Sequence, residues 1–381
     1  MNAVPAVPTR AAAPALAALL TSCFLTTTSP TPTNPRGTVI VPNGASGVAI
    51  VHVEDASGDL LATASVRNLA AAGNVTLVAE PADFSQGIVA TDQELQTLNA
   101  ATTLPEVTDD VALSSLLSSG SPGTVLSVAV FADSTFSAVQ MSGVSSFATT
   151  CFTGGLHVGQ NQTLVAGAPA ATAMLASPDG SLMAAWGSEG LVFWNITATT
   201  SPHAVQYSPT PPYPASTPVV TGRGAMAFDP TSSDTLLAGG PDGTLHAFTN
   251  LHTAPAHQSI DLPGKPAVAS VAYAPGGQYA VVATTSGLFT VSVSAGVPAA
   301  AAAPSNPTYT GSDGSTYPLS GAQSLAITAD GSYLVALTDQ PSASAGTLVV
   351  MPIDASGTVG PVGLTQGGLL ATAGADVLLV H

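Results

Sequence analysis

One short pattern occurs four times in the second half of the chain, and it limits the folds open to the sequence. Each copy has a short strand of alternating apolar and polar residues, a tight turn rich in Pro, Asp and Gly, and a second, more apolar strand. Asp and Gly tolerate the positive φ that such hairpin turns need. The four copies are Ala173–Trp186, Ala225–Gly239, Ser270–Val282 and Ser324–Ala336.

The copies are regularly spaced. Their turns lie at Asp179, Asp229, Gly276 and Asp330, which are 50, 47 and 54 residues apart. A second hairpin follows in the first three copies, at Gly187–Gly190, Gly240–Gly243 and Ser286–Gly287. A recurring unit of three to four strands with this period is typical of the blades of a β-propeller. The density of Gly, Pro and β-branched residues excludes helical repeats.

The first half of the chain carries weaker signals of the same kind. Apolar or alternating runs predict strands at residues 39–41, 49–53, 60–66, 75–79, 87–90 and 125–131, and the last of these together with Ser134–Met141 predicts a divergent blade. At about 50 residues per unit, residues 38–381 hold seven units.

Two apolar runs near the C-terminus, Leu369–Ala373 and Val377–Val380, lack a complete unit of their own. We expect them to pair with the first strands after Gly37, because such a join removes the open edges of the array. The predicted fold class is all-β, a β-propeller of seven four-stranded blades closed by pairing of N- and C-terminal strands. The alternative is a separate all-β domain at residues 38–165 followed by a smaller array.

The best preserved copy lies between Ala171 and Thr197. It runs from Ser177-Pro178-Asp179-Gly180 through Trp186 to Trp194-Asn195, and it resembles a blade of the WD-repeat family, with Trp194-Asn195 in the place of that family's Trp-Asp pair. No Gly-His pair opens the copies, and the others lack the tryptophan. The sequence therefore resembles the broader propeller superfamily, including the YVTN-type extracytoplasmic repeats, over about residues 170–365. This resemblance implies structural roles for Asp179, Asp330 and Trp194.

The first 23 residues are typical of an export signal. Arg10 precedes a short apolar stretch, Ala11–Leu20, which is too short to span a membrane. Leu20-Thr21-Ser22-Cys23 resembles the bacterial lipobox, which implies lipidation of Cys23. Residues 24–37, rich in Thr and Pro, then form a linker to a propeller at 38–381, and we expect an extracytoplasmic, membrane-anchored lipoprotein of the cell envelope or surface. The alternatives are an ordinary cleaved signal and an Ala-rich segment without a targeting role.

Cys151 lies in an alternating apolar and polar run, Ser145–Phe152, which predicts a buried thiol on a strand. A disulfide between Cys23 and Cys151 is the alternative if Cys23 is not lipidated. Three sequons, at Asn74, Asn161 and Asn195, are glycan acceptors only in a eukaryotic secreted protein.

The charge of the chain argues against two classes of partner. Lysine and arginine total 5 against 22 acidic residues, which gives a net charge of -17. Binding to nucleic acid needs clustered Lys and Arg that neutralise phosphates, and adhesion to anionic lipid needs a basic patch. Membrane contact is therefore expected only through a lipid on Cys23. The acids crowded between Glu54 and Asp110 predict a solvated acidic face, or else a site for divalent cations or a basic partner.

His246, His252 and His257 form the one cluster of histidines in the sequence. Zinc sites usually have closer pairs in the company of Cys or carboxylate ligands, so we expect a polar strand and loop here. No metal-binding residue is predicted.

The sequence also lacks the common signatures of catalysis. Asp179, Asp242 and Asp330 recur where turn geometry needs them, so we expect structural roles. A Gly-x-Ser-x-Gly elbow and a phosphate-cradling loop are absent, and the serines are too numerous for a Ser-His-Asp set to be chosen. We therefore predict that the protein is not an enzyme, with no catalytic residue, no cofactor-binding residue and no cofactor.

These observations predict a non-catalytic exported propeller that binds protein partners as a scaffold subunit of an envelope or extracellular assembly. Function in such folds resides in the loops, and the candidate contact loops are Ser208–Pro218 and Pro298–Pro318. The alternative is a propeller enzyme of the lactonase or quinoprotein type, which needs converging acids, His or Arg at the mouth of the channel. A purely structural subunit is a third hypothesis.

Overall fold

The computed structural model describes residues 38–54, 60–69, 71, 73–79, 86–99, 106–116, 123–131, 136–144, 146–151, 156–158, 171–187, 190–198, 205–209, 223–299, 301, 303–369 and 378–380. The predicted signal, the lipobox at Cys23 and the linker at 24–37 lie outside these residues. Helical structure within them is confined to three 3-10 turns, η1 (Leu113–Leu116), η3 (Arg223–Ala225) and η4 (Ala343–Ala345). None of the described helices has the length and apolarity needed to cross a membrane.

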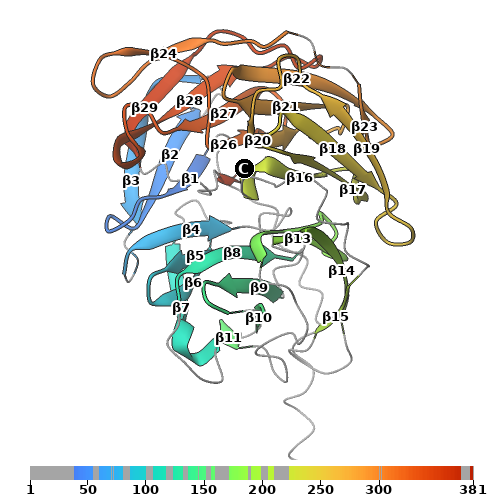
Figure 1. Cartoon of the computed structure of the whole chain (residues 1–381). Coiled ribbons are helices and arrows are strands. Elements are labelled where there is room, and N and C mark those ends of the chain that lie inside the picture. Colours follow the sequence, from blue (N-terminus) through green and yellow to red (C-terminus); the bar gives the residue numbers. More distant parts are fainter. Residues whose placement is uncertain are drawn as a thin grey trace, which may run out of the picture.

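Six antiparallel sheets, each made of four consecutive strands, are arranged in a ring, so the fold is an all-β propeller (Figure 1). The first three blades are β4 (Val75–Ala79), β5 (Gly87–Thr91), β6 (Glu94–Asn99) and β7 (Glu106–Ala112); β8 (Val125–Val130), β9 (Phe136–Met141), β10 (Ala148–Cys151) and β11 (His157–Val158); and β12 (Ala171–Ala176), β13 (Leu182–Gly187), β14 (Gly190–Ala198) and β15 (Val205–Pro209). The next three are β16 (Met226–Asp229), β17 (Ser232–Gly239), β18 (Thr244–Thr249) and β19 (Ala256–Asp261); β20 (Val268–Tyr273), β21 (Tyr279–Thr284), β22 (Gly287–Ser294) and β23 (Val297–Pro298); and β26 (Ser324–Ile327), β27 (Tyr333–Thr338), β28 (Gly346–Pro352) and β29 (Leu364–Leu369).

A further four-stranded sheet joins the two ends of the described chain. Its order is β3 (Leu60–Leu69), β2 (Val48–Glu54), β1 (Thr38–Pro42) and β30 (Leu378–Val380). Thr38 pairs with Val380 and Ile40 with Leu378 in antiparallel register, as expected from the apolar run at the C-terminus. β30 lies near the centre of the ring (Figure 1). The second expected run, Leu369–Ala373, lies outside the described residues after Leu369, where β29 ends.

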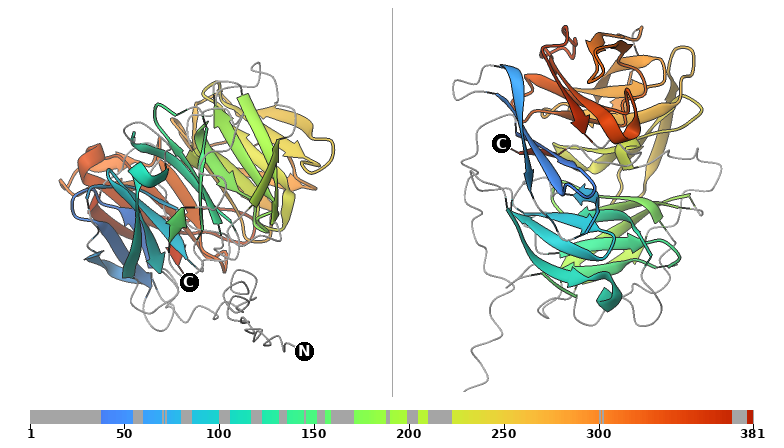
Figure 2. Two further views of the ribbon diagram at one scale, coloured as in Figure 1. Left: turned by 90° about the horizontal axis from the view of Figure 1, so that it is seen from below. Right: turned by 90° about the vertical axis from the view of Figure 1, so that its left-hand side faces the viewer.

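The first strand of each blade is its innermost strand. β4 contacts β8, β8 contacts β12, and the series continues through β16, β20 and β26. β26 in turn contacts β30, and β1 contacts β4. Figure 2 shows the sheets following one another in chain order. Apolar faces of successive blades pack together, and one buried cluster extends from β12–β14 through β16–β18 to β20–β22. Removing these faces from water is the main driving force for the fold.

The repeated sequence pattern forms equivalent hairpins. In the β12–β13 turn, the amide of Gly180 donates to the carbonyl of Ser177, and Gly180 has a φ of 70°. In the β26–β27 turn, Gly331 donates to Thr328 in the same way and has a φ of 72°. Glycine is needed at both positions because a side chain strains this backbone conformation.

Trp194 and Cys151 occupy one core between neighbouring blades. Trp194 on β14 is buried and packs edge-on against Phe147, with ring centroids 5.4 Å apart. Cys151 ends β10 and is fully buried in the same cluster, which confirms the predicted buried thiol on a strand. Trp194 is thus structural, as its resemblance to the WD-repeat pattern implied.

Two parts of the fold differ in detail from the sequence prediction. β6 and β7 were not expected, and β7 is mostly exposed. The candidate loop Pro298–Pro318 contains a two-stranded hairpin of β24 (Thr308–Thr310) and β25 (Thr316–Pro318). Its Tyr309 is buried, and the Tyr309 hydroxyl is 2.7 Å from that of Thr338. The other candidate loop, Ser208–Pro218, lies beyond the described residues after β15 ends at Pro209.

Candidate functional site

Six residues occupy equivalent positions at the starts of the innermost strands. Each of four innermost strands has a β-bulge after its first residue, and the extra residue has the same position in each repeat. The sequence repeat places two further residues at this position, just before β16 and β26. The six residues are Thr76, Leu126, Thr172, Gly224, Ala269 and Gln323. None of these six is an acid, a base or a histidine, so these positions supply no acid–base group.

Two of the recurrent aspartates, Asp330 and Asp242, accept hydrogen bonds within their own turns. Asp330 accepts hydrogen bonds from the Thr328 hydroxyl at 2.7 Å and the Ser332 amide at 3.0 Å. Asp242 accepts from the amide of Thr244 at 3.2 Å and from its hydroxyl at 3.1 Å. The hydrogen bonds of these carboxylates stabilise their own turns, as those of aspartate commonly do.

The three clustered histidines fall into two separate places. His246 on β18 is buried, and its Nδ1 is 2.8 Å from Nε2 of His257 on β19. Burial, and then the neighbouring His257, lower the pKa of His246 to about 4. His252 lies in the β18–β19 turn, at one end of the blade. Across the described ranges, no group of three or more His, Cys, Asp or Glu side chains is placed to hold a metal ion.

His252 connects an aspartate and a serine in one chain of hydrogen bonds. Its Nδ1 is 2.9 Å from Oδ1 of Asp234 on β17, and its Nε2 is 2.8 Å from Oγ of Ser181 in the β12–β13 turn. Ser181 belongs to the neighbouring blade, so the chain crosses the junction between two blades. A hydroxyl, an imidazole and a carboxylate joined in this order form the arrangement that activates serine nucleophiles in hydrolases.

Local structure fixes the imidazole on the Asp234 side. The His252 backbone amide donates to Oδ1 of Asp234 at 2.8 Å, so the carboxylate holds both the ring and the main chain. The turn is closed by amides of Thr253 and Ala254, which donate to the carbonyl of Asn250. The His252 and Asp234 side chains are 35% and 42% exposed, which leaves the hydrogen-bonded chain open to a molecule in solution.

Asp179 is a fourth member of this cluster. Its Oδ1 accepts from the Ser181 hydroxyl at 2.6 Å, from the Ser181 amide at 2.9 Å and from the Ser177 hydroxyl at 2.8 Å. Desolvation raises the Asp179 pKa, but hydrogen bonds from Ser181, Ser233 and Ser177 outweigh it and lower the pKa to about 2. Asp179 is therefore charged at neutral pH.

The single hydroxyl proton of Ser181 can be donated to only one of its two partners. If it goes to Asp179, His252 must donate from Nε2 as well as from Nδ1, and the imidazole is doubly protonated. If His252 is neutral with its proton on Nδ1 towards Asp234, Nε2 accepts the proton of Ser181. The second state is the one in which His252 can act as a general base.

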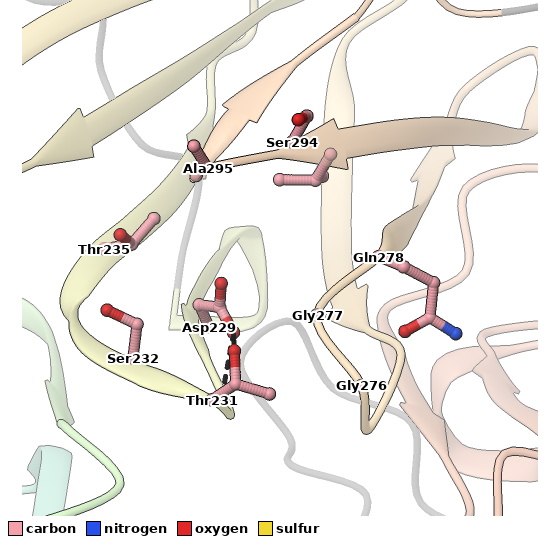
Figure 3. Close-up of a pocket in the computed structure, with 11 residues that line it drawn as sticks. Asp229, Thr231, Ser232, Thr235, Gly276, Gly277, Gln278, Ser294 and Ala295 are labelled. Carbon is pink, nitrogen blue, oxygen red and sulfur yellow. Dashed lines mark hydrogen bonds between the residues drawn. The ribbon is translucent and has the colours of Figure 1, made fainter.

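A polar cleft of about 510 Å³ lies at the next blade junction (Figure 3). Thr231, Ser232 and Thr235 lie along one side and the loop Gly276–Gln278 along the other (Figure 3). The cleft lies between the β16–β19 and β20–β23 blades, whereas His252 meets Ser181 at the junction with the β12–β15 blade. The cleft is therefore separate from the hydrogen-bonded chain. A similar cleft of about 360 Å³ occurs one junction further on, so blade packing itself generates such hollows.

Neither Ser181 nor Asp234 could be selected from the sequence. Ser181 is 71 residues from His252, and Asp234 is 18 residues from it. The one usable signal is that His252 lies next to the turns of the repeat, at the end of the blades where the turns of neighbouring copies meet.

Solved structures of similar fold include proteins with lactonase names. The periplasmic gluconolactonase PpgL of Pseudomonas aeruginosa is 15% identical, covers 90% of this chain and 99% of its own length, and gives a TM-score of 0.59. A candidate 6-phosphogluconolactonase of Bacteroides uniformis is 13% identical over 90% of this chain and 100% of its own, with a TM-score of 0.58. The β-propeller domain of Cps50 (Swd1) of Myceliophteria thermophila is 15% identical over 77% and 88%, with a TM-score of 0.52.

These similarities establish the fold: a β-propeller that resembles the lactonase-type propellers. No protein-family model matches the sequence, and no curated protein matches it at a significant level. The identities are too low for any function to be transferred by similarity alone.

Proposed function

We propose that the protein is a hydrolase of esters or lactones, and that Ser181 is its nucleophile. The observation that carries this proposal is the chain of hydrogen bonds from Asp234 through His252 to Ser181, at 2.9 and 2.8 Å. The resemblance of the fold to proteins named as lactonases supports the same class of reaction. This proposal replaces the expectation of a non-catalytic protein.

The proposed reaction has two halves. Oγ of Ser181 attacks the carbonyl carbon, and Nε2 of His252 accepts the hydroxyl proton and passes it to the departing alkoxide oxygen as the acyl–oxygen bond breaks. In a lactone that oxygen remains tethered to the acyl group. Water then attacks the acyl-serine with His252 as base, releasing the acid and restoring Ser181. Asp234 holds the ring in the required tautomer.

Covalent labelling tests the nucleophile. A fluorophosphonate probe phosphonylates an activated serine, so the full-length protein should gain one adduct that peptide mass spectrometry places on Ser181. The Ser181→Ala and His252→Ala variants should lose the adduct. The matched control is Ser332→Ala, because Ser332 occupies the same position in the β26–β27 turn, where Asp330 accepts from its amide.

Turnover of 4-nitrophenyl acetate is the second readout. His252→Ala should lower kcat by about 10²–10⁴, the usual contribution of general acid–base catalysis, while Ser332→Ala changes nothing. Failure of the probe to label Ser181, together with equal turnover by wild type and Ser181→Ala, refutes the proposal.

A non-catalytic protein-binding scaffold is the second candidate. It is favoured by the six innermost-strand positions that carry no ionisable group, because a propeller enzyme centred on its channel needs such groups there. The β24–β25 hairpin is its best described contact surface. Cross-linking in the native host, with and without deletion of residues 299–322, tests this candidate, since loss of a partner only in the deletion supports it.

We also infer that the sheet of β30, β1, β2 and β3 is a seventh blade, within one propeller at residues 38–381, because β26 and β4 contact it from both sides. Lipidation of Cys23 and location of the protein at the cell envelope are also proposals. Intact mass after expression in the native host tests them: loss of residues 1–22 with added mass on Cys23 supports lipidation, and an intact Met1 refutes it.

A further inference from the structure

We infer that Asp179 is a specificity-determining residue that makes the Ser181 site select uncharged acyl donors and reject those carrying a phosphate or carboxylate. The inference rests on the proposed function and concerns the class of substrate. It separates this protein from any enzyme whose substrate is a phosphorylated lactone.

The first support is the place of the Asp179 carboxylate. Its Oδ1 is 2.6 Å from Oγ of Ser181, the atom that would form the bond to substrate. Two further hydrogen bonds, from the Ser181 amide and the Ser177 hydroxyl, hold it there. Any acyl group on Ser181 must therefore lie within a few ångströms of a fixed negative charge.

The second support is the second acid of the site. Asp234 lies on the far side of His252, and when His252 is neutral the site carries two carboxylates and no positive charge. This neutral state of His252 is the one required for attack, so repulsion of an anion is strongest at the catalytic step.

The third support is the position of the nearest cation whose side chain is described. Lys265, the only lysine of the chain, is bound to Asp261 at 2.8 Å. Asp261 pairs with Thr244 at the end of the β18–β19 hairpin opposite to the turn that carries His252. A six-residue strand separates the two ends by about 17 Å, which is beyond the Debye length at physiological salt.

Two pairs of compounds test the inference. 4-Nitrophenyl acetate and 4-nitrophenyl hemisuccinate share a leaving group and differ in the charge of the acyl part. Gluconolactone and its 6-phosphate differ in the same sense. For each pair, kcat/KM should be about 10- to 100-fold higher for the uncharged compound, the range for a like charge held a few ångströms away at intermediate dielectric. The ratio should shrink as salt is added, since salt screens an exposed charge.

The variant Asp179→Asn removes the charge and keeps an acceptor for the turn. It should raise the ratio of kcat/KM for the hemisuccinate to kcat/KM for the acetate about 10-fold, as one like-charge interaction is removed. Asp330→Asn, in the equivalent turn of the β26–β29 blade, is the matched control and should leave this ratio unchanged. The salt dependence of the wild type supplies the same information if the variant does not fold.

The outcomes separate this inference from the proposed function. Equal turnover of charged and uncharged compounds by wild type, with dependence on Ser181 retained, overturns the inference alone. Absence of any turnover that depends on Ser181 overturns the proposed function and this inference with it. A charge preference that Asp179→Asn leaves unchanged assigns the selectivity to another residue and also overturns the inference.

Discussion

Mild acid should destabilise this protein through one buried histidine. His246 is 6% exposed, its Nδ1 faces Nε2 of His257 at 2.8 Å, and its own Nε2 has no hydrogen-bond partner among the described residues. Burial, followed by the charge of His257, lowers its pKa to about 4, although Asp242 and Asp261 act in the opposite direction. The folded protein therefore keeps His246 neutral well below pH 6.5.

The size of the effect follows from proton linkage. In the unfolded chain this histidine has the ordinary pKa of 6.5, so between pH 6.5 and about 4 the unfolded state binds a proton that the folded state does not. The contribution of His246 to stability is fully present above pH 6.5 and is lost as the pH falls towards 4. The loss amounts to about 2 kcal/mol at pH 5 and about 3 kcal/mol at pH 4.

Urea unfolding at pH 7.5 and pH 5.0 measures this loss. Wild type should lose about 2 kcal/mol more between these pH values than His246→Gln, which cannot titrate. Ser259→Ala is the matched control, because Ser259 pairs with His246 across the two strands and carries no charge. If His246→Gln keeps the full pH dependence of wild type, the assignment to His246 is refuted.

Three further experiments test the fold, each by urea unfolding. Removal of residues 378–381 makes β1 an edge strand. It should lower the free energy of unfolding by at least about 2 kcal/mol, the value of burying one large apolar side chain. An unchanged unfolding midpoint contradicts closure of the ring by β30. Gly243→Ala should lower the free energy of unfolding more than Gly314→Ala. Both glycines have a positive φ, but only at Gly243 would the added Cβ meet backbone, 2.2 Å from the carbonyl carbon of Lys265. Equal decreases in the two variants contradict this prediction. Trp194→Ala should lower the free energy of unfolding by about 3–5 kcal/mol. Trp194→Phe should lower it much less, because the indole Nε1 has no hydrogen-bond partner among the described residues. An equal decrease in Trp194→Phe contradicts this prediction.

The hairpins could be predicted because their chemistry is local. Ser177-Pro178-Asp179-Gly180 and its equivalents determine a turn within a few residues, and the apolar strands on both sides determine which faces are buried. β7 was not predicted, because its sequence carries no such local signal. It is the outermost strand of its blade, so Glu106 and Asp110 are exposed there and no apolar alternation is required.

The candidate site depends on contacts between blades, and the sequence does not reveal these. His252 meets Asp234 within its own blade but meets Ser181 only because the neighbouring turn packs beside it. The conclusion that no Ser-His-Asp set could be chosen was correct for the sequence alone, since nothing distinguishes Ser181 from Ser332 in the same turn position. The structure distinguishes them, because in the described chain a histidine is hydrogen-bonded to Ser181.

The sheet that contains both β1 and β30 sets the order in which the protein can mature. Thr38 and Val380 are neighbours in that sheet although 342 residues separate them along the chain. Each other blade can form as soon as its own four strands are available, whereas this sheet must wait until β30 has been synthesised. The ring therefore stays open, with an unpaired edge at β1, until β30 has been synthesised.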